Sequence, residues 1–193
     1  MERPEAPGLT PFQPTGPYPQ VMLDLPTGAA LPLSAVARGE RIVIEGSLHG
    51  GDGNPIVDAM IETWQADAEG RYPHPLDPRG ADADPGFWGY RRVATDQDGC
   101  FRIETIKPGS VLLRPGSDTR QAPHIVVGIY GGGIPYRYAT RLYFEGEPLN
   151  ETDPVLQLVP ASRRATLIAK REGATYRFSI VLQGAGETVF FDL

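Results

Sequence analysis

Three histidines and eight tyrosines are the side chains of this sequence that could hold a metal ion or transfer a proton. His124 begins an apolar run, residues 124–130, whose composition predicts a strand. Positions 124 and 126 of a strand point to the same face, so a histidine at both would present two imidazoles to one metal ion. Position 126 is valine. We therefore expect His124 to be a buried, hydrogen-bonded histidine with no second imidazole beside it.

The remaining candidates for chemistry are weaker. His49 adjoins the glycines of a turn, where a histidine is expected to be exposed, and His74 lies in a loop stiffened by prolines on both sides. Cys100 is the only cysteine. The sequence contains no His-Glu-x-x-His, Cys-x-x-Cys, phosphate-loop or Gly-x-Ser-x-Gly motif, and the three glycines 131–133 are read as a flexible turn. These patterns disfavour a zinc site, a nucleotide site and a serine nucleophile.

Charge and cysteine content narrow the class of protein. The formal net charge is −6, and the basic pairs are scattered, which disfavours a nucleic-acid groove because phosphate contacts need clustered Lys and Arg. A lone cysteine cannot form an intrachain disulfide, and the sequence contains neither a signal-peptide pattern nor a long apolar run. We expect a cytoplasmic protein.

Short strands separated by turn chemistry predict an all-β fold. Alternating apolar and polar residues, with glycine, proline and aspartate between the runs, are typical of a β-sandwich. The predicted strands are 41–48, 59–65, 100–105, 124–130, 140–144, 166–170, 176–182 and 188–191. One short helix is predicted over residues 151–159, where Asp153 could cap and Pro154 would be the first helical residue, and Ser162 could start a further turn.

Residues 1–40 form a separate unit in this prediction. Eight prolines lie between positions 4 and 32, and each proline fixes its own φ and restricts the residue before it. Such a segment is extended and has few ways to pair within a sheet, so it docks on another surface. We favour a partner chain over the protein's own domain, residues 41–193, as that surface.

Five segments, taken in order, resemble the intradiol ring-cleaving dioxygenases. The resemblance extends to Thr15-Gly16-Pro17-Tyr18 near the N-terminus and to residues 186–191 near the C-terminus, so it covers nearly the whole chain. The five segments are residues 62–72, 95–99, 105–109, 122–125 and 141–146. The resemblance implies a mixed β-sandwich and a mononuclear Fe(III) site of two tyrosinates and two histidines, at which a catecholate chelates the iron and reacts with O2.

The ligand positions that the resemblance implies are only partly kept. After Lys107-Pro108-Gly109 the family has a proline and a ligand tyrosine, but this sequence has Ser110 and Val111. The histidine pair becomes His124 and Val126, and Gln121 stands where an arginine is usual. Tyr72 could match the first ligand tyrosine or a neighbouring tyrosine that binds no metal. At most two of the four ligands remain, so we expect no metal and no catalytic residue in this chain alone.

The resemblance therefore implies a partner. We expect Fe(III) in a homologous partner chain that binds the aromatic substrate and O2, in a hetero-oligomer of such pairs. The arm residues Thr15, Gly16, Pro17 and Tyr18 would reach toward the partner's substrate pocket, or would only fill the interface between the chains. The alternative to a subunit is a stand-alone, non-catalytic β-sandwich binding module, a role that folds of this class also serve.

Overall fold

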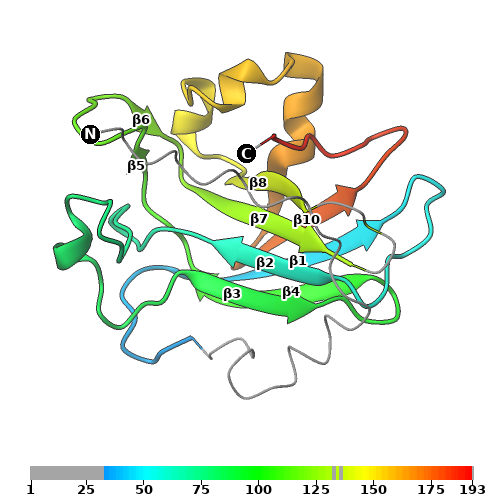
Figure 1. Cartoon of the computed structure of the whole chain (residues 1–193), viewed down its shortest axis with the longest axis horizontal. Coiled ribbons are helices and arrows are strands. Elements are labelled where there is room, and N and C mark those ends of the chain that lie inside the picture. Colours follow the sequence, from blue (N-terminus) through cyan, green and yellow to red (C-terminus); the bar gives the residue numbers. More distant parts are fainter. Residues whose placement is uncertain (1–32, 132–133, 135–136, 193) are drawn as a thin grey trace, which may run out of the picture.

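Eight strands form the body of the protein in the computed structural model, which describes residues 33–131, 134 and 137–192 (Figure 1). All eight belong to one sheet in the order β3-β2-β7-β8-β9-β10-β1-β4. The strands are β1 (Arg41–His49), β2 (Met60–Trp64), β3 (Tyr90–Ala94), β4 (Cys100–Ile106), β7 (His124–Tyr130), β8 (Tyr138–Phe144), β9 (Ile168–Glu172) and β10 (Thr175–Val181). A separate two-stranded ladder pairs β5 (Val111–Leu112) with β6 (Arg120–Gln121).

The sheet is mixed and nearly closed. β1 runs parallel to β10 and β8 runs parallel to β9, whereas the other ladders are antiparallel. β3 and β4 end the strand order but lie close together in space (Figure 1). The predicted mostly-β, mixed fold is confirmed. A β-sandwich has two separate sheets, whereas here the β8–β9 ladder joins all eight strands into one continuous sheet.

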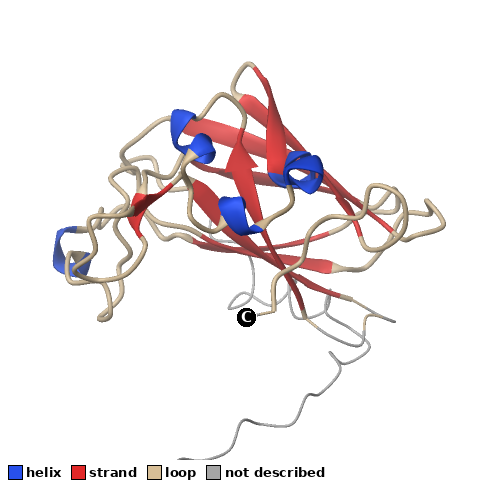
Figure 2. Ribbon diagram, turned by 90° about the horizontal axis from the view of Figure 1, so that it is seen from above, coloured by secondary structure: helices blue, strands red, loops and turns tan. Residues whose placement is uncertain are grey.

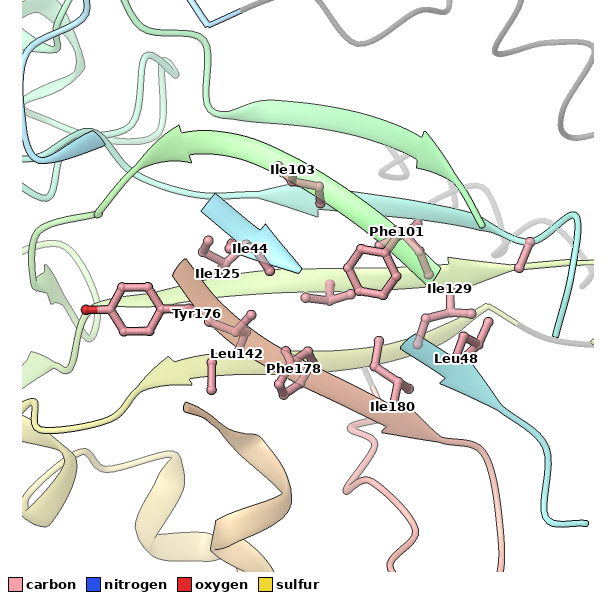
Figure 3. Packing of buried hydrophobic residues seen from close by; sticks show 14 of the residues in the cluster. Ile44, Leu48, Phe101, Ile103, Ile125, Ile129, Leu142, Tyr176, Phe178 and Ile180 are labelled. Carbon is pink, nitrogen blue, oxygen red and sulfur yellow. The ribbon is translucent and has the colours of Figure 1, made fainter. Parts of the chain in front are cut away.

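The main core lies between the two halves of this sheet. Alternate residues of each strand point inward, as in β10, where residues 176, 178 and 180 are buried and the residues between them are exposed. The inward side chains shown in Figure 3 include Ile44, Leu48, Phe101, Ile103, Ile125, Ile129, Leu142, Tyr176, Phe178 and Ile180. This apolar burial, contributed by strands from β1 to β10, is the main stabilising contribution to the fold.

Most predicted strands are present, but β3, β5 and β6 were not predicted and one predicted strand is missing. Residues 90–94 form β3, which was not predicted, and residues 188–191 form no strand. The latter segment is nevertheless attached, since Thr188 N donates to Val181 O at 2.9 Å and Phe191 N donates to Ala139 O at 2.8 Å. The turns at residues 49–55 and 95–99 were predicted correctly.

The predicted helix at 151–159 is wrong. In the described residues the helical segments are short 3-10 turns, and they lie outside the sheet (Figure 2). Their bounds are η1 (Gly80–Asp82), η2 (Pro148–Glu151), η3 (Leu156–Leu158) and η4 (Ala161–Leu167). Asp153 does accept backbone bonds at the start of η3, as a capping residue would, but from a position between two turns.

The last eight residues before β1 contact their own domain. Arg38 N donates to Asp84 Oδ2 at 2.7 Å, and Lys107 N donates to Glu40 O at 2.8 Å. The four arm residues Thr15, Gly16, Pro17 and Tyr18 lie outside the described residues. Among the helical segments that the structure describes, none has the length and apolar character needed to cross a membrane.

Candidate functional site

A cavity of about 480 Å³ opens at the end of the sheet where the β5–β6 ladder and the 70–79 loop meet strands β2, β7 and β8. Its size is in the range of small-molecule sites. Its walls are Trp64, Tyr72, His74, Leu76, Asp77, Pro78, Arg79, Val111, Leu112, Leu113, Arg114, Pro115, Gln121, His124, Val126 and Arg141. The four positions of the predicted former metal site, Tyr72, Val111, His124 and Val126, therefore come together around one cavity.

Strand register sets the floor of this cavity. Val126 of β7 is paired with Trp64 of β2 on one side and with Arg141 of β8 on the other. Directly paired residues of antiparallel strands point to the same face of a sheet. An indole, an isopropyl group and a guanidinium thus form one row across three strands. His124, two residues before Val126, continues the same face and pairs with Tyr143.

A tight turn positions Tyr72. Asp67 is buried, and its Oδ1 accepts bonds from the backbone N–H groups of Glu69 and Arg71, both at 2.9 Å. Gly70 lies in the turn with φ +73°, and a Cβ there would lie 1.9 Å from Ser110 O. Only glycine lets the two loops approach this closely.

The same approach places both Tyr72 and Val111 on the cavity wall. Tyr72 N donates to Asp77 Oδ2 at 2.9 Å. The Tyr72 ring stacks on Trp64, with a centroid distance of 5.6 Å and an interplanar angle of 17°. Burial raises the pKa of the Tyr72 hydroxyl, and the nearby Arg141 opposes that shift only partly. Tyr72 is therefore a neutral phenol in this cavity.

His124 is held as a neutral imidazole. Burial, with a smaller contribution from the Arg141 charge, lowers the pKa of His124 to about 4. Its Nδ1 lies 2.8 Å from Ala122 O, so Nδ1 carries the hydrogen and donates it to that carbonyl. Nε2 is left as the acceptor at the cavity wall. The expectation of a buried, hydrogen-bonded His124 is confirmed.

A buried carboxylate fixes the strand junction behind His124. Asp153 is completely buried and accepts four hydrogen bonds. Ala122 N donates to Oδ2 at 2.7 Å, and the Tyr143 hydroxyl donates to Oδ1 at 3.1 Å. Because these two donors belong to the β6–β7 junction and to β8, Asp153 fixes the backbone from which both Gln121 and His124 reach the cavity.

Arg141 has a neutral hydrogen-bonding partner. Its Nη1 donates to Gln121 Oε1 at 2.7 Å and more weakly to the Tyr143 hydroxyl at 3.4 Å. Gln121 Nε2 in turn donates to Leu112 O at 3.2 Å. Within the described residues Arg141 forms no ion pair with a carboxylate. The guanidinium charge therefore acts on the cavity with little compensation.

These donors do not fit an Fe(III) ion. Fe(III) is a hard cation that requires several anionic oxygen donors, and the four positions implied as ligands keep only the neutral phenol of Tyr72 and the neutral imidazole of His124. Val111 and Val126 place methyl groups at the other two positions, and Arg141 adds a positive charge. Across the described part of the chain, no group of three or more His, Cys, Asp or Glu residues is placed to hold a metal.

Sequence reasoning found part of the cavity and missed part. His74, rated a minor candidate, lies on the cavity wall, where its Nδ1 accepts a bond from Leu76 N at 3.2 Å. Trp64 and Arg141 were recognised only as members of segments that resemble the intradiol dioxygenases and were given no role. Their alternation with Glu62 and Tyr143 along predicted strands was the available signal. Asp153 was expected to cap a helix, but its carboxylate also accepts bonds from Ala122 N and from the Tyr143 hydroxyl, which are distant in sequence.

Comparisons with known proteins agree with the resemblance. A family model described as a dioxygenase matches residues 24–184. The chain is 41% identical to the protocatechuate 3,4-dioxygenase alpha chain of Burkholderia cepacia, with 95% of this chain and 97% of that protein covered. It is 40% identical to the alpha chain of Pseudomonas putida, with 95% and 96% covered. It is 37% identical to the beta chain of Burkholderia cepacia over 78% of this chain and 67% of that protein.

Solved structures share the fold. The dioxygenase domain of a dioxygenase and carbohydrate-binding protein fusion from Streptomyces sp. SirexAA-E is 27% identical, with a TM-score of 0.57 over 78% of this chain and 84% of that chain. Catechol 1,2-dioxygenase from Acinetobacter sp. ADP1 is 21% identical, with a TM-score of 0.61 over 79% of this chain and 56% of that chain. The second likeness concerns the fold alone.

Proposed function

Because this chain belongs to the intradiol dioxygenase family, we propose that it is the non-metal-binding alpha subunit of a protocatechuate 3,4-dioxygenase. In this proposal it pairs with a homologous beta chain that carries Fe(III). The complex cleaves protocatechuate with O2 to 3-carboxy-cis,cis-muconate, and the iron and its chemistry belong to the beta chain. Two alpha-chain relatives matched over nearly their whole length support this assignment over that of a stand-alone binding module.

The observation that carries the proposal is the donor set of the cavity. Val111 and Val126 line it at two of the four positions that the family uses for iron ligands. A valine cannot be adapted to metal binding by a change of rotamer or protonation. The family fold and its cavity are thus kept while two of the four ligand positions are lost, as expected for a subunit whose partner performs the reaction.

The N-terminal arm belongs to the same proposal. Thr15, Gly16, Pro17 and Tyr18 would extend from this domain to the beta chain and line its substrate pocket. Residues 33–40 support an arm that leaves from a fixed point, because Arg38 and Glu40 are bonded to the domain. We place the complex in the cytoplasm, where the exposed free thiol of Cys100 would remain reduced.

Metal analysis and O2 uptake test the proposal. The chain is expressed alone and together with a candidate beta chain, and each preparation is assayed for iron, for tyrosinate-to-iron visible absorption and for O2 uptake with protocatechuate. We expect colour, iron and turnover only in the pair, at one iron for each pair. Stoichiometric iron in the chain alone, or a pair that fails to form, would refute it.

A further inference from the structure

The cavity that has lost its metal ligands has the properties of an anion site. Three arginines, Arg79, Arg114 and Arg141, and one carboxylate, Asp77, line it. Asp77 is already engaged, since its Oδ1 lies 3.6 Å from Arg79 Nε. The lining is therefore net positive in a chain whose formal net charge is −6. A partly enclosed cation in an acidic protein attracts a negatively charged ligand.

The remaining walls are apolar and aromatic. Trp64 and Tyr72 form a stacked pair on one side, and Val111, Leu113 and Val126 contribute aliphatic surface. Apolar and aromatic walls with a few fixed polar groups are the usual lining of a small-molecule site. An inorganic anion would use the arginine but leave these walls without a partner, whereas a planar aromatic ring would cover them.

The row across the sheet gives the spacing of the two kinds of group. Trp64 and Arg141 lie on either side of Val126, two strands apart, which corresponds to about 10 Å between their backbones. One aromatic ring with a carboxylate spans this gap when the ring lies over Val126. The guanidinium fork matches a carboxylate in shape, and the Gln121 amide fixes the fork through Nη1 at 2.7 Å.

We propose that this cavity is a metal-free binding site for a benzoate-type aromatic carboxylate, with the carboxylate on Arg141 and the ring between Val126 and the Trp64–Tyr72 wall. No hydroxyl groups are needed on the ring, because no metal is present for a diol to chelate. Recognition thus differs in kind from chelation at an iron centre. Every residue of the site belongs to this chain, so the site does not depend on the proposed pairing with a beta chain.

Calorimetric titration of the purified full chain tests this site with four probes. Benzoate and 3,4-dihydroxybenzoate are expected to bind with Kd values below about 1 mM and within about threefold of each other. Benzamide has the same shape but no charge, and catechol has the diol but no carboxylate. Both are expected to bind at least about tenfold more weakly, since a charge-assisted bond is lost. Phosphate is the probe for a general anion site and is expected not to compete.

Three variants locate the site. Arg141→Gln is expected to weaken benzoate binding at least about tenfold, and Arg141→Lys, which keeps the charge but loses the fork, is expected to have an intermediate effect. Val126→Phe fills the cavity without touching a charge and is expected to abolish binding. Arg177→Gln is the matched control, because Arg177 is an exposed arginine of β10 that does not line the cavity.

The results separate this proposal from its alternatives. Equal binding of benzoate and benzamide, or competition by phosphate, would overturn it. So would an unchanged benzoate affinity in either Val126→Phe or Arg141→Gln, with melting temperatures showing that each variant is folded. Absence of benzoate binding to the wild-type chain would also overturn it. That result would leave the proposed subunit function untouched, since the latter depends on iron and turnover in the pair.

Discussion

Replacement of Asp153 tests the account of how the cavity is held. Asp153 is fully buried, and its two oxygens accept bonds from three backbone N–H groups and from the Tyr143 hydroxyl. Asp153→Asn keeps the shape of the side chain. One oxygen becomes an NH2 group, which must then face a donor. In the less costly orientation the NH2 group faces Ala122 N, and that N–H is left without an acceptor.

The expected loss follows from these bonds. An unsatisfied buried donor costs about 1–3 kcal/mol, and each bond that changes from a charged to a neutral acceptor loses part of its strength. We therefore expect Asp153→Asn to lower the free energy of unfolding by about 3 kcal/mol. Urea titration followed by tryptophan fluorescence measures this value by linear extrapolation.

The matched control is Asp98→Asn. Asp98 is an exposed aspartate in the β3–β4 turn, and its side chain accepts no hydrogen bond from the described residues. This variant should stay within about 0.5 kcal/mol of the wild type. If the two variants were equally stable, Asp153 would not hold the junction of β6 and β7, and the explanation for the placement of His124 would fail.

Three further predictions concern other parts of the site. The pKa of His124 is about 4 in the folded protein and 6.5 in the unfolded chain. The free energy of unfolding is therefore highest above pH 6.5, where His124 is neutral in both states, and it falls as the pH drops from 6.5 toward 4. The loss should be about 3 kcal/mol and should be absent from His124→Gln in urea titrations at each pH. Gly70→Ala should cost about 3 kcal/mol or more, because its Cβ would collide with Ser110 O, whereas Gly146→Ala, with φ +77° and nothing within 4 Å, should cost about 1 kcal/mol. Thermal melts compare the two, and similar values would exclude a close approach at Gly70. Deletion of residues 1–20 should weaken assembly or turnover of the pair with a beta chain, and unchanged affinity and turnover would contradict the role given to the arm.

Strands with a regular apolar alternation were predictable from the sequence, and β3 shows why one was not. Tyr90-Arg91-Arg92-Val93-Ala94 places two arginines side by side, which reads as a surface segment. In the fold, Arg92 bonds Glu62 of β2 at 3.0 Å, while the buried Arg91 donates to the carbonyls of Trp88 and Tyr90. Glu62, the partner of Arg92, comes from another strand and is not contained in local propensity, whereas Arg91 is satisfied by carbonyls one and three residues before it.

The helix predicted at 151–159 failed for a related reason. Its cap and its first-turn proline were local signals of the correct kind. The segment is instead held by Leu156 and Val159, which belong to a second small core with Ala122, Tyr143 and Leu167. Asp153 has its carboxylate committed to β8 and to Ala122, so the chain forms separate 3-10 turns around that anchor. A fixed tertiary contact decided the local structure.

Some cavity residues could be predicted from local motifs, whereas others depend on the long-range register of the strands. Strand spacing identified His124 and Val126, and the resemblance to the family identified Val111 by its place after Lys107-Pro108-Gly109. The position of Arg141 beside Val126 depends on the β7–β8 register, which no short motif specifies. The same register places Arg141 in the cavity, so a cavity without iron ligands can still bind a charged molecule. A guanidinium next to two neutral donors makes a trivalent cation more costly and an anion less costly at the same point. A cavity of this kind, once it no longer holds Fe(III), is therefore electrostatically suited to the carboxylate of an aromatic acid without any change in the strands that form it.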